Sequence, residues 1–513
     1  MHKDAPRRLR LLAPVGLAAI VLAACSGSPT PLAGSHPPTT RKTTTTTTTT
    51  PVVATSTSTV PVTPIAWSSC GSDLQCGTLT VPLDYADPSG PTIGMAVERH
   101  LAEVPADRIG SLVIDPGGPG VSGIDDMSNE LSVLTSGLLD DFDIVTFDPR
   151  GVQRSDPVNC GNSGGAPTST LPDPIPQTTA AKQALLSNNR SFGQQCQKDS
   201  GAILSQVGTV DVARDMERLR IALGDSALTY MGQSYGTLIG LMYAQLYPTH
   251  IRAMVLDSVI DPSLTLSQMT LGQAEGFEST LGSFFTWCSG SSACPWAEGS
   301  DPTSTLLALI AKSRTDAAPG PGQEAAGPGE IYDALLEGLY APTDYATLGD
   351  ALAQDAAGQG DGVVAMADHY AQDGSSNGSD AAEAIDCADH PAPSGLSAYN
   401  ALAFEFSAEA PVFGPLLSWG EAACSVWPVP PSREPANVTA PGSPPILVIG
   451  TTQDPATPYA WAVHVAKELS HGVLLTHDGD DHVSYFYSAC VRADAQTYLV
   501  NLSTPPVGRV CTS

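Results

Sequence analysis

The stretch that most constrains the fold is Tyr230–Thr237, which contains the motif Gly-x-Ser-x-Gly around Ser234. Residues 227–231 are apolar and favour a buried strand, whereas residues 237–247 have helical apolar spacing and stop at Pro248. A strand, a sharp turn and a helix are the context in which this motif forms a nucleophile elbow with a strained serine. Because two of the five motif positions are free, a glycine-rich turn before a core helix is the alternative.

Strand-like and helical runs alternate on both sides of Ser234, which predicts an α/β fold with a parallel sheet covered on both faces. The first two strands favour an antiparallel pair, because their turn reads Asp87-Pro88-Ser89-Gly90. Helices are expected at residues 210–223 and 460–469. The expected strands are residues 79–85, 92–99, 111–115, 142–148, 253–258, 445–450 and 472–476.

The alternation stops between about Pro262 and Pro430, where Ala-rich helical stretches are broken by Gly/Pro loops. A mostly helical cap inserted between sheet strands explains this change, since the sheet needs its last strands from the C-terminal segment. We therefore predict a core formed by residues 67–262 and 431–513, with the cap at 263–430.

The N-terminal segment resembles the leader of a bacterial lipoprotein. A basic start is followed by a short apolar run that ends in Leu22-Ala23-Ala24-Cys25, so residues 1–24 are expected to be a signal peptide with Cys25 lipidated. An ordinary signal peptide with an incidental cysteine is the alternative, and Arg7-Arg8 leaves the export route open between general secretion and twin-arginine transport. Residues 25–66 are rich in Thr, Pro and Ser and predict a disordered, lipid-anchored linker.

The formal net charge of −30 argues against a nucleic-acid partner or an anionic membrane surface. The leader predicts export, with the protein held on the extracellular face of the cell membrane by its lipid alone, and the charge favours solubility outside the cell. The protein is expected to be a monomer. No metal or organic cofactor is implied.

Eleven cysteines are present, and ten remain if Cys25 carries lipid. An even number in an exported chain favours five disulfides, although sequence alone does not fix the pairing. A metal site is the competing interpretation, but no Cys-x-x-Cys occurs and the histidines lie apart from the cysteines. Pairing by neighbour order would join Cys70–Cys76, Cys160–Cys196, Cys288–Cys294, Cys387–Cys424 and Cys490–Cys511.

A nucleophilic serine needs a base, and the base needs an orienting acid. Asp454 and His482 each follow a predicted strand, so both are expected at the sheet edge that carries Ser234. Asp454 would hold the imidazole tautomer, and His482 would take the serine proton. Asp454 could instead be a turn residue before Pro455, and His477 is the alternative base.

An oxyanion hole is the second requirement. One donor should be the backbone N–H of Tyr235, which follows the nucleophile. The other should come from Gly117 or Gly118, in the loop Pro116-Gly117-Gly118-Pro119-Gly120 after an early strand, with a plain Pro/Gly turn as the alternative.

Together, the segments 115–120, 147–151 and 232–237 resemble the tripeptidyl aminopeptidase and proline iminopeptidase branch of the α/β hydrolases. The segments 81–85 and 454–458 are similar to secreted members from high-GC Gram-positive bacteria. The resemblance implies a serine exopeptidase whose cap recognises a free peptide N-terminus. Relatives often carry His before Gly-Gly-Pro-Gly, and Gly before the catalytic histidine, so the exact specificity is left open.

An aminopeptidase should offer an anion to the substrate ammonium. The segment Ile385–Asp389 resembles a cap element near the substrate entrance of the family, which suggests Asp389, and then Asp386, for this role. Solvated acids beside a disulfide are the alternative. A carboxylesterase or lipase on the same scaffold and a non-catalytic envelope lipoprotein are the competing functions. A haloalkane or epoxide hydrolase is disfavoured, because those enzymes use Asp at the elbow.

Overall fold

In the computed structural model, the described residues are 61–161, 170–296, 301–322, 324–372 and 377–512. The predicted signal peptide, the predicted lipidation site Cys25 and nearly all of the predicted linker lie outside them. No helix among the described residues combines the length and apolar character needed to cross a membrane.

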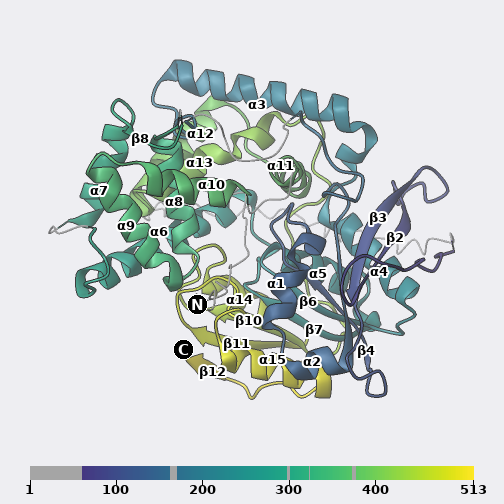
Figure 1. Ribbon diagram of the computed structural model, residues 1–513. Coiled ribbons are helices and arrows are strands. Elements are labelled where there is room, and N and C mark those ends of the chain that lie inside the picture. The colour runs from purple at the N-terminus through teal and green to yellow at the C-terminus, as the bar shows by residue number, and fades with distance from the viewer. Residues whose placement is uncertain (1–60, 162–169, 297–300, 323, 373–376, 513) are drawn as a thin grey trace, which may run out of the picture.

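A ten-stranded sheet forms the centre of the core, in the order β1-β2-β3-β5-β4-β6-β7-β10-β11-β12 (Figure 1). The pairs from β1 to β5 are antiparallel, and all the others are parallel. The strands are β1 (Ser68–Ser69), β2 (Leu74–Pro82), β3 (Thr92–His100), β4 (Gly110–Asp115), β5 (Phe142–Phe147), β6 (Leu228–Gln233), β7 (Ile251–Asp257), β10 (Ile446–Thr451), β11 (Gly472–Asp478) and β12 (Val510–Thr512).

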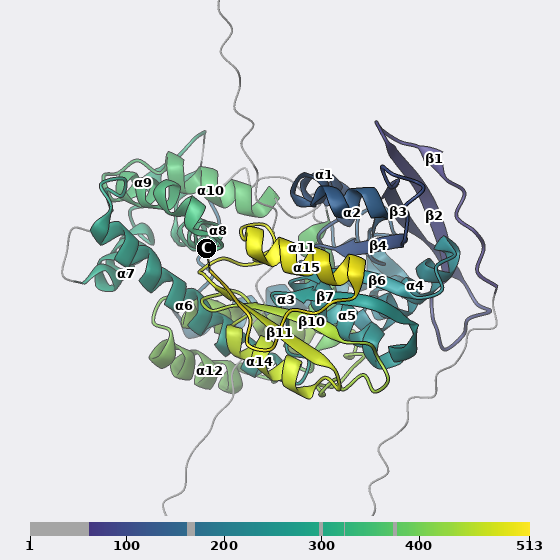
Figure 2. The same ribbon diagram turned by 90° about the horizontal axis from the view of Figure 1, so that it is seen from below.

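Helices cover both faces of this sheet, because its central strands are apolar on both sides. Within β4, Leu112 and Ile114 pack on one face, and Val113 packs on the other. Figure 2 shows the sheet between the two helical layers. One layer holds α1 (Gly123–Val133), α2 (Ser136–Asp141) and α15 (Ala489–Asn501), and the other holds α4 (Thr209–Leu223), α5 (Tyr235–Leu246) and α14 (Tyr459–Glu468).

A helical cap lies between β7 and β10 in sequence. Most of its helices share their own hydrophobic core, whereas the buried apolar side chains of the helix at Gly378–Asp389 pack into the cluster on the α4 and α5 face of the sheet. Its elements are α6 (Leu266–Gly290), α7 (Pro302–Ser313), β8 (Ala318–Pro319), β9 (Ala325–Ala326), α8 (Pro328–Leu339), the 3-10 helix η3 (Pro342–Asp344), α9 (Tyr345–Ala356), α10 (Asp361–Gln372), α11 (Gly378–Asp389), α12 (Leu396–Glu409), α13 (Phe413–Gly420) and the 3-10 helix η4 (Glu421–Val426).

Helix α3 (Thr179–Ser200) joins the cap, although it precedes the elbow in sequence. It runs across the top of the molecule in Figure 1. Its Leu185 and Leu186 pack on the core of the cap, and Phe192 packs on Trp427. The cap therefore includes a helix from outside the predicted range of residues 263–430.

Five disulfides are present, and they join the cysteines that neighbour order pairs. A disulfide sulfur is not a thiolate, so these ten cysteines do not form the metal site considered as the alternative. The bonds are Cys70–Cys76, Cys160–Cys196, Cys288–Cys294, Cys387–Cys424 and Cys490–Cys511.

Candidate active site

Ser234 lies in the sharp turn between β6 and α5. Its φ of 51° falls in the left-handed region, and its side chain is buried. A Cβ at Gly232 would lie 2.5 Å from the carbonyl oxygen of Gly236, and a Cβ at Gly236 would lie 2.5 Å from that of Asp115. At both motif positions the neighbouring backbone leaves no room for a Cβ, so glycine is required. This is the geometry of a nucleophile elbow.

Asp454 follows β10 and His482 follows β11, at the same sheet edge as Ser234. The Nδ1 atom of His482 lies 2.8 Å from Oδ1 of Asp454, and both side chains are fully buried. A proton on Nδ1 leaves the Nε2 lone pair available to accept another. Neither Nε2 of His482 nor Oγ of Ser234 hydrogen-bonds to a described residue.

Four further hydrogen bonds fix the Asp454 carboxylate. The N–H groups of Ala456 and Thr457 donate to Oδ1 over 2.9 and 2.8 Å. The hydroxyls of Thr457 and Ser258 donate to Oδ2 over 2.9 and 2.6 Å. Ser258 also accepts the N–H of Val483 over 2.7 Å, so one hydroxyl connects the acid to the histidine loop.

His477, the alternative base, lies inside β11 and pairs with Asp481 over 3.1 Å. Burial acts to lower the pKa of His477, but the hydrogen bond and charge of Asp481 outweigh it, and the pKa is raised. His482, not His477, is therefore the histidine that bonds Asp454.

The glycine loop after β4 lies directly against the elbow. Gly117 has a φ of 98°, and a Cβ there would lie 2.8 Å from the nitrogen of Tyr235. The N–H of Gly117 donates to Oδ1 of Asp115 over 3.0 Å, whereas the N–H groups of Gly118 and Tyr235 donate to no described acceptor. Of the three candidate donors, those of Gly118 and Tyr235 are thus available to a substrate. Burial raises the pKa of Asp115 to about 7.

The two predicted amine-binding acids differ in their surroundings, although both lie buried on α11. Both oxygens of Asp389 accept hydrogen bonds from Thr209, so this carboxylate already has partners. Oδ2 of Asp386 is buried and has no partner among the described residues.

Glu383 lies one helical turn before Asp386 and was not identified from the sequence. Burial raises its pKa to about 7. The pKa of Asp386 is raised well above its usual value by burial and by the charges of Glu383 and Asp389. The spacing of Glu383 and Asp386 on a helical stretch was the signal that could have singled out Glu383.

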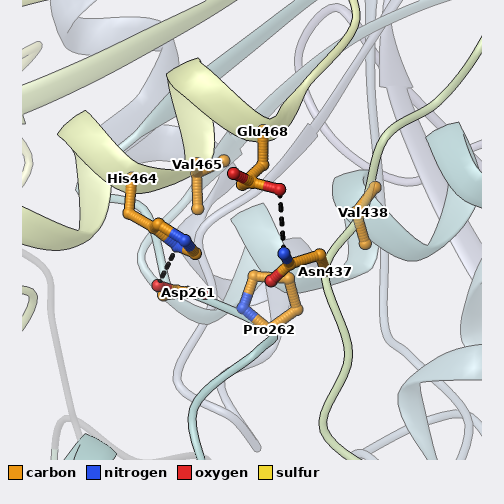
Figure 3. A pocket seen from close by; sticks show the side chains of 7 residues that line it. All are labelled: Asp261, Pro262, Asn437, Val438, His464, Val465 and Glu468. Carbon is orange, nitrogen blue, oxygen red and sulfur yellow. Dashed lines mark hydrogen bonds and ion pairs between the residues drawn. The ribbon is translucent and has the colours of Figure 1, made fainter.

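A separate surface depression lies between α14 and the two segments that lead into and out of the cap (Figure 3). His464 pairs there with Asp261 over 2.6 Å, and Glu468 accepts a hydrogen bond from Asn437 over 2.8 Å. None of the predicted site residues lines this depression.

Comparisons with known proteins agree with this architecture. A family model described as the alpha/beta hydrolase fold matches residues 110–299, and one described as TAP-like protein matches residues 410–511.

Curated relatives match most of the chain. Serine protease Hip1 of Mycobacterium tuberculosis (strain ATCC 25618 / H37Rv) is 34% identical over 481 residues, covering 87% of this chain and 91% of that protein. A tripeptidyl aminopeptidase of Streptomyces lividans is 31% identical, covering 85% and 84% of the two chains. A protein named carboxylesterase B, also of M. tuberculosis H37Rv, is 32% identical, covering 87% and 89%. The chain therefore belongs to the α/β-hydrolase family of serine hydrolases, in the group related to tripeptidyl aminopeptidases.

Proposed function

We propose that this serine hydrolase is an exopeptidase that releases short peptides from a free N-terminus. The Ser234 hydroxyl attacks the scissile carbonyl while His482 takes its proton through Nε2 and Asp454 holds the imidazole. The C–N bond then breaks, and the proton passes to the leaving amine. Water hydrolyses the resulting ester on Ser234 by the reverse proton route.

The N–H groups of Tyr235 and Gly118 would stabilise the oxyanion of the tetrahedral intermediate. The first belongs to the elbow and the second to the adjacent glycine loop, and neither donates to a described acceptor. The N–H of Gly117 would instead hold the loop in shape through its bond to Asp115. Such preorganised donors stabilise charge that develops only in the transition state.

The observation that carries the exopeptidase specificity is the buried Oδ2 atom of Asp386, which has no hydrogen-bond partner among the described residues. Residues three or four apart share one face of a helix, so Gly378, Ala382, Asp386 and Asp389 form one face of α11. A Cβ at Gly120 would lie 2.4 Å from the carbonyl oxygen of Gly378 and 3.0 Å from the nitrogen of Ala382.

At the other end of this face, Asp389 hydrogen-bonds to Thr209, which contacts Tyr235. Asp386 lies between these two contacts along α11. Its charge also contributes to raising the pKa of Tyr235, which burial chiefly causes. An ammonium would compensate this buried acid and the neighbouring Glu383, and a free peptide N-terminus supplies one.

The test is hydrolysis of aminoacyl, dipeptidyl and tripeptidyl fluorogenic amides, each with a free and an N-acetylated N-terminus. We expect cleavage that needs the free amine and disappears in Ser234→Ala. Asp386→Asn should lower kcat/KM for free-amine substrates at least about 10-fold, since a buried charge-assisted hydrogen bond contributes about 1.5–3 kcal/mol. Asp350→Asn, an exposed acid on cap helix α9, is the matched control and should change nothing.

A carboxylesterase is the second candidate, because one relative of similar identity is named as such. It uses the same triad and oxyanion hole but needs no amine-binding acid. Equal cleavage of free and acetylated amides, or rapid Ser234-dependent hydrolysis of short esters without amide cleavage, would favour it over the exopeptidase.

We further propose export and anchoring at the cell membrane through a lipid on Cys25. Five disulfides support an oxidising compartment. Incorporation of labelled palmitate into the native protein, but not into Cys25→Ala, is the expected result. Equal labelling of both proteins, or of neither, would contradict anchoring at this cysteine.

A further inference from the structure

A buried chain of hydrogen bonds runs from the cap to the residue after the nucleophile. Asp389, at the end of α11, bonds the hydroxyl of Thr209, and the same hydroxyl bonds the phenol of Tyr235. The exposed fractions of the three residues are 1%, 0% and 3%, so this series of hydrogen bonds is buried. None of these side-chain bonds belongs to the acid–base pair of Asp454 and His482.

The donor and acceptor of each hydrogen bond in this series can be assigned. Both oxygens of Asp389 act as acceptors, because the Thr209 N–H donates to Oδ1 over 2.9 Å and its hydroxyl donates to Oδ2. A hydroxyl has one proton, so the Thr209 oxygen must accept from the phenol of Tyr235. The N-cap residue Gly208 has no side chain, so Asp389 supplies the cap for α4 from another helix.

The same cap helix also contacts the glycine loop that follows β4. Gly120 lies against Gly378 and Ala382, at the start of α11. One helix thus contacts the glycine loop at its first turn and Tyr235, through Thr209, at its last turn. In Figure 1, α11 lies beneath α3 and above α5.

We propose that Asp389 and Thr209 are positioning residues that fix Tyr235, so that the cap sets the geometry of the oxyanion hole. The backbone N–H of Tyr235 would face the substrate, and the hydrogen bonds through Thr209 to Asp389 hold its phenol in place. The inference rests on the oxyanion role proposed above for the Tyr235 N–H. It does not depend on whether the substrate is a peptide or an ester.

The experiment measures kcat and KM of the full chain with a short ester and with a tripeptidyl amide. Tyr235→Phe removes only the donor hydroxyl, Thr209→Val removes the link, and Thr209→Ser keeps a hydroxyl. Tyr243→Phe is the matched control, because this buried tyrosine lies on the same helix but donates to Glu217 over 2.7 Å.

We expect Tyr235→Phe and Thr209→Val each to lower kcat about 10-fold on both substrates with KM nearly unchanged, since sub-ångström misplacement of an oxyanion donor weakens transition-state binding. In the double variant, kcat should fall no further than in the weaker of the two single variants, because both changes interrupt the same series of hydrogen bonds. Thr209→Ser should retain most of kcat, and Tyr243→Phe all of it.

Unchanged kcat in Tyr235→Phe and Thr209→Val would overturn the proposal. Fully additive losses, or an equal loss in Tyr243→Phe, would also overturn it, because they indicate general destabilisation. If neither substrate shows Ser234-dependent turnover in the native chain, the proposed function itself fails, which is a distinguishable result.

Discussion

Replacement of Ser258 tests how the acid and the histidine loop are held together. The Ser258 hydroxyl donates to Asp454 and accepts from the N–H of Val483, and the side chain is fully buried. Ser258→Ala removes a hydrogen bond to a charged group, which contributes about 1.5–3 kcal/mol, and leaves a buried N–H unpaired at a cost of about 1–3 kcal/mol. We therefore expect the free energy of unfolding to fall by about 2.5–6 kcal/mol.

The backbone of Ser258 supplies a matched control. Its φ of 59° is unfavourable for any residue with a Cβ and costs about 1–2 kcal/mol. Ser258→Gly removes the same hydroxyl but relieves this strain, so it should unfold at a higher urea concentration than Ser258→Ala. Both variants should lose kcat to the same extent, because only the hydroxyl acts on Asp454.

The expected loss in kcat is partial. Asp454 keeps three donors besides His482, namely the N–H groups of Ala456 and Thr457 and the Thr457 hydroxyl. We expect kcat for a short ester to fall about 10-fold, far less than the roughly 10⁴-fold loss that accompanies removal of a triad acid. Urea denaturation and steady-state kinetics on the two variants provide both readouts. A loss in kcat below twofold with unchanged stability would refute this reasoning.

Three further outcomes are expected. We expect a bell-shaped pH dependence for the ratio of kcat/KM with a free tripeptidyl amide to kcat/KM with a short ester. The ratio should fall at low pH because Asp386, whose pKa is raised, loses its charge. It should also fall above about pH 8 because the substrate amine loses its proton. The ratio should be low and flat in Asp386→Asn; a bell that persists there contradicts the assignment. Because burial raises the pKa of Asp115 to about 7, the folded state favours its neutral form, and the free energy of unfolding should decline between about pH 4 and pH 7. Urea titrations of Asp115→Asn should show a shallower decline, and an equal slope would count against this explanation. Replacing both Cys387 and Cys424 by Ser should lower stability by about 2–5 kcal/mol and reduce kcat/KM for free-amine substrates, because this disulfide joins α11 to η4. Removing the Cys70–Cys76 disulfide at β2 is the control. Equal losses of kcat/KM in both variants would argue against a specific role for α11.

The elbow and its sheet could be predicted because their signals are local. A strand, a glycine-flanked serine and a helix follow one another within about twenty residues around Ser234. Parallel strands bring their carboxyl ends to one edge, so the positions of Asp454 and His482 also followed from the sequence. The predicted strands match the observed ones to within a few residues, except that β2 begins at Leu74 and the short edge strands were not foreseen.

The missed features depend on contacts between distant segments. Asp389 is 180 residues from Thr209 in sequence, and nothing near either residue indicates that they bond. Helix α3 has an ordinary amphipathic pattern that does not reveal whether it covers the sheet or the cap. Ser258 follows a buried strand like many serines, and only the fold brings it between Asp454 and Val483.

The most direct test of the account is the mass of the acyl-enzyme. The protein is mixed with a tripeptidyl ester, quenched in acid within milliseconds, and examined by intact-protein and peptide mass spectrometry. We expect a tripeptidyl adduct on the peptide that contains Ser234, absent from Ser234→Ala and strongly reduced for the N-acetylated ester. An adduct on another residue, or equal acylation by the free and acetylated esters, would contradict the proposed exopeptidase.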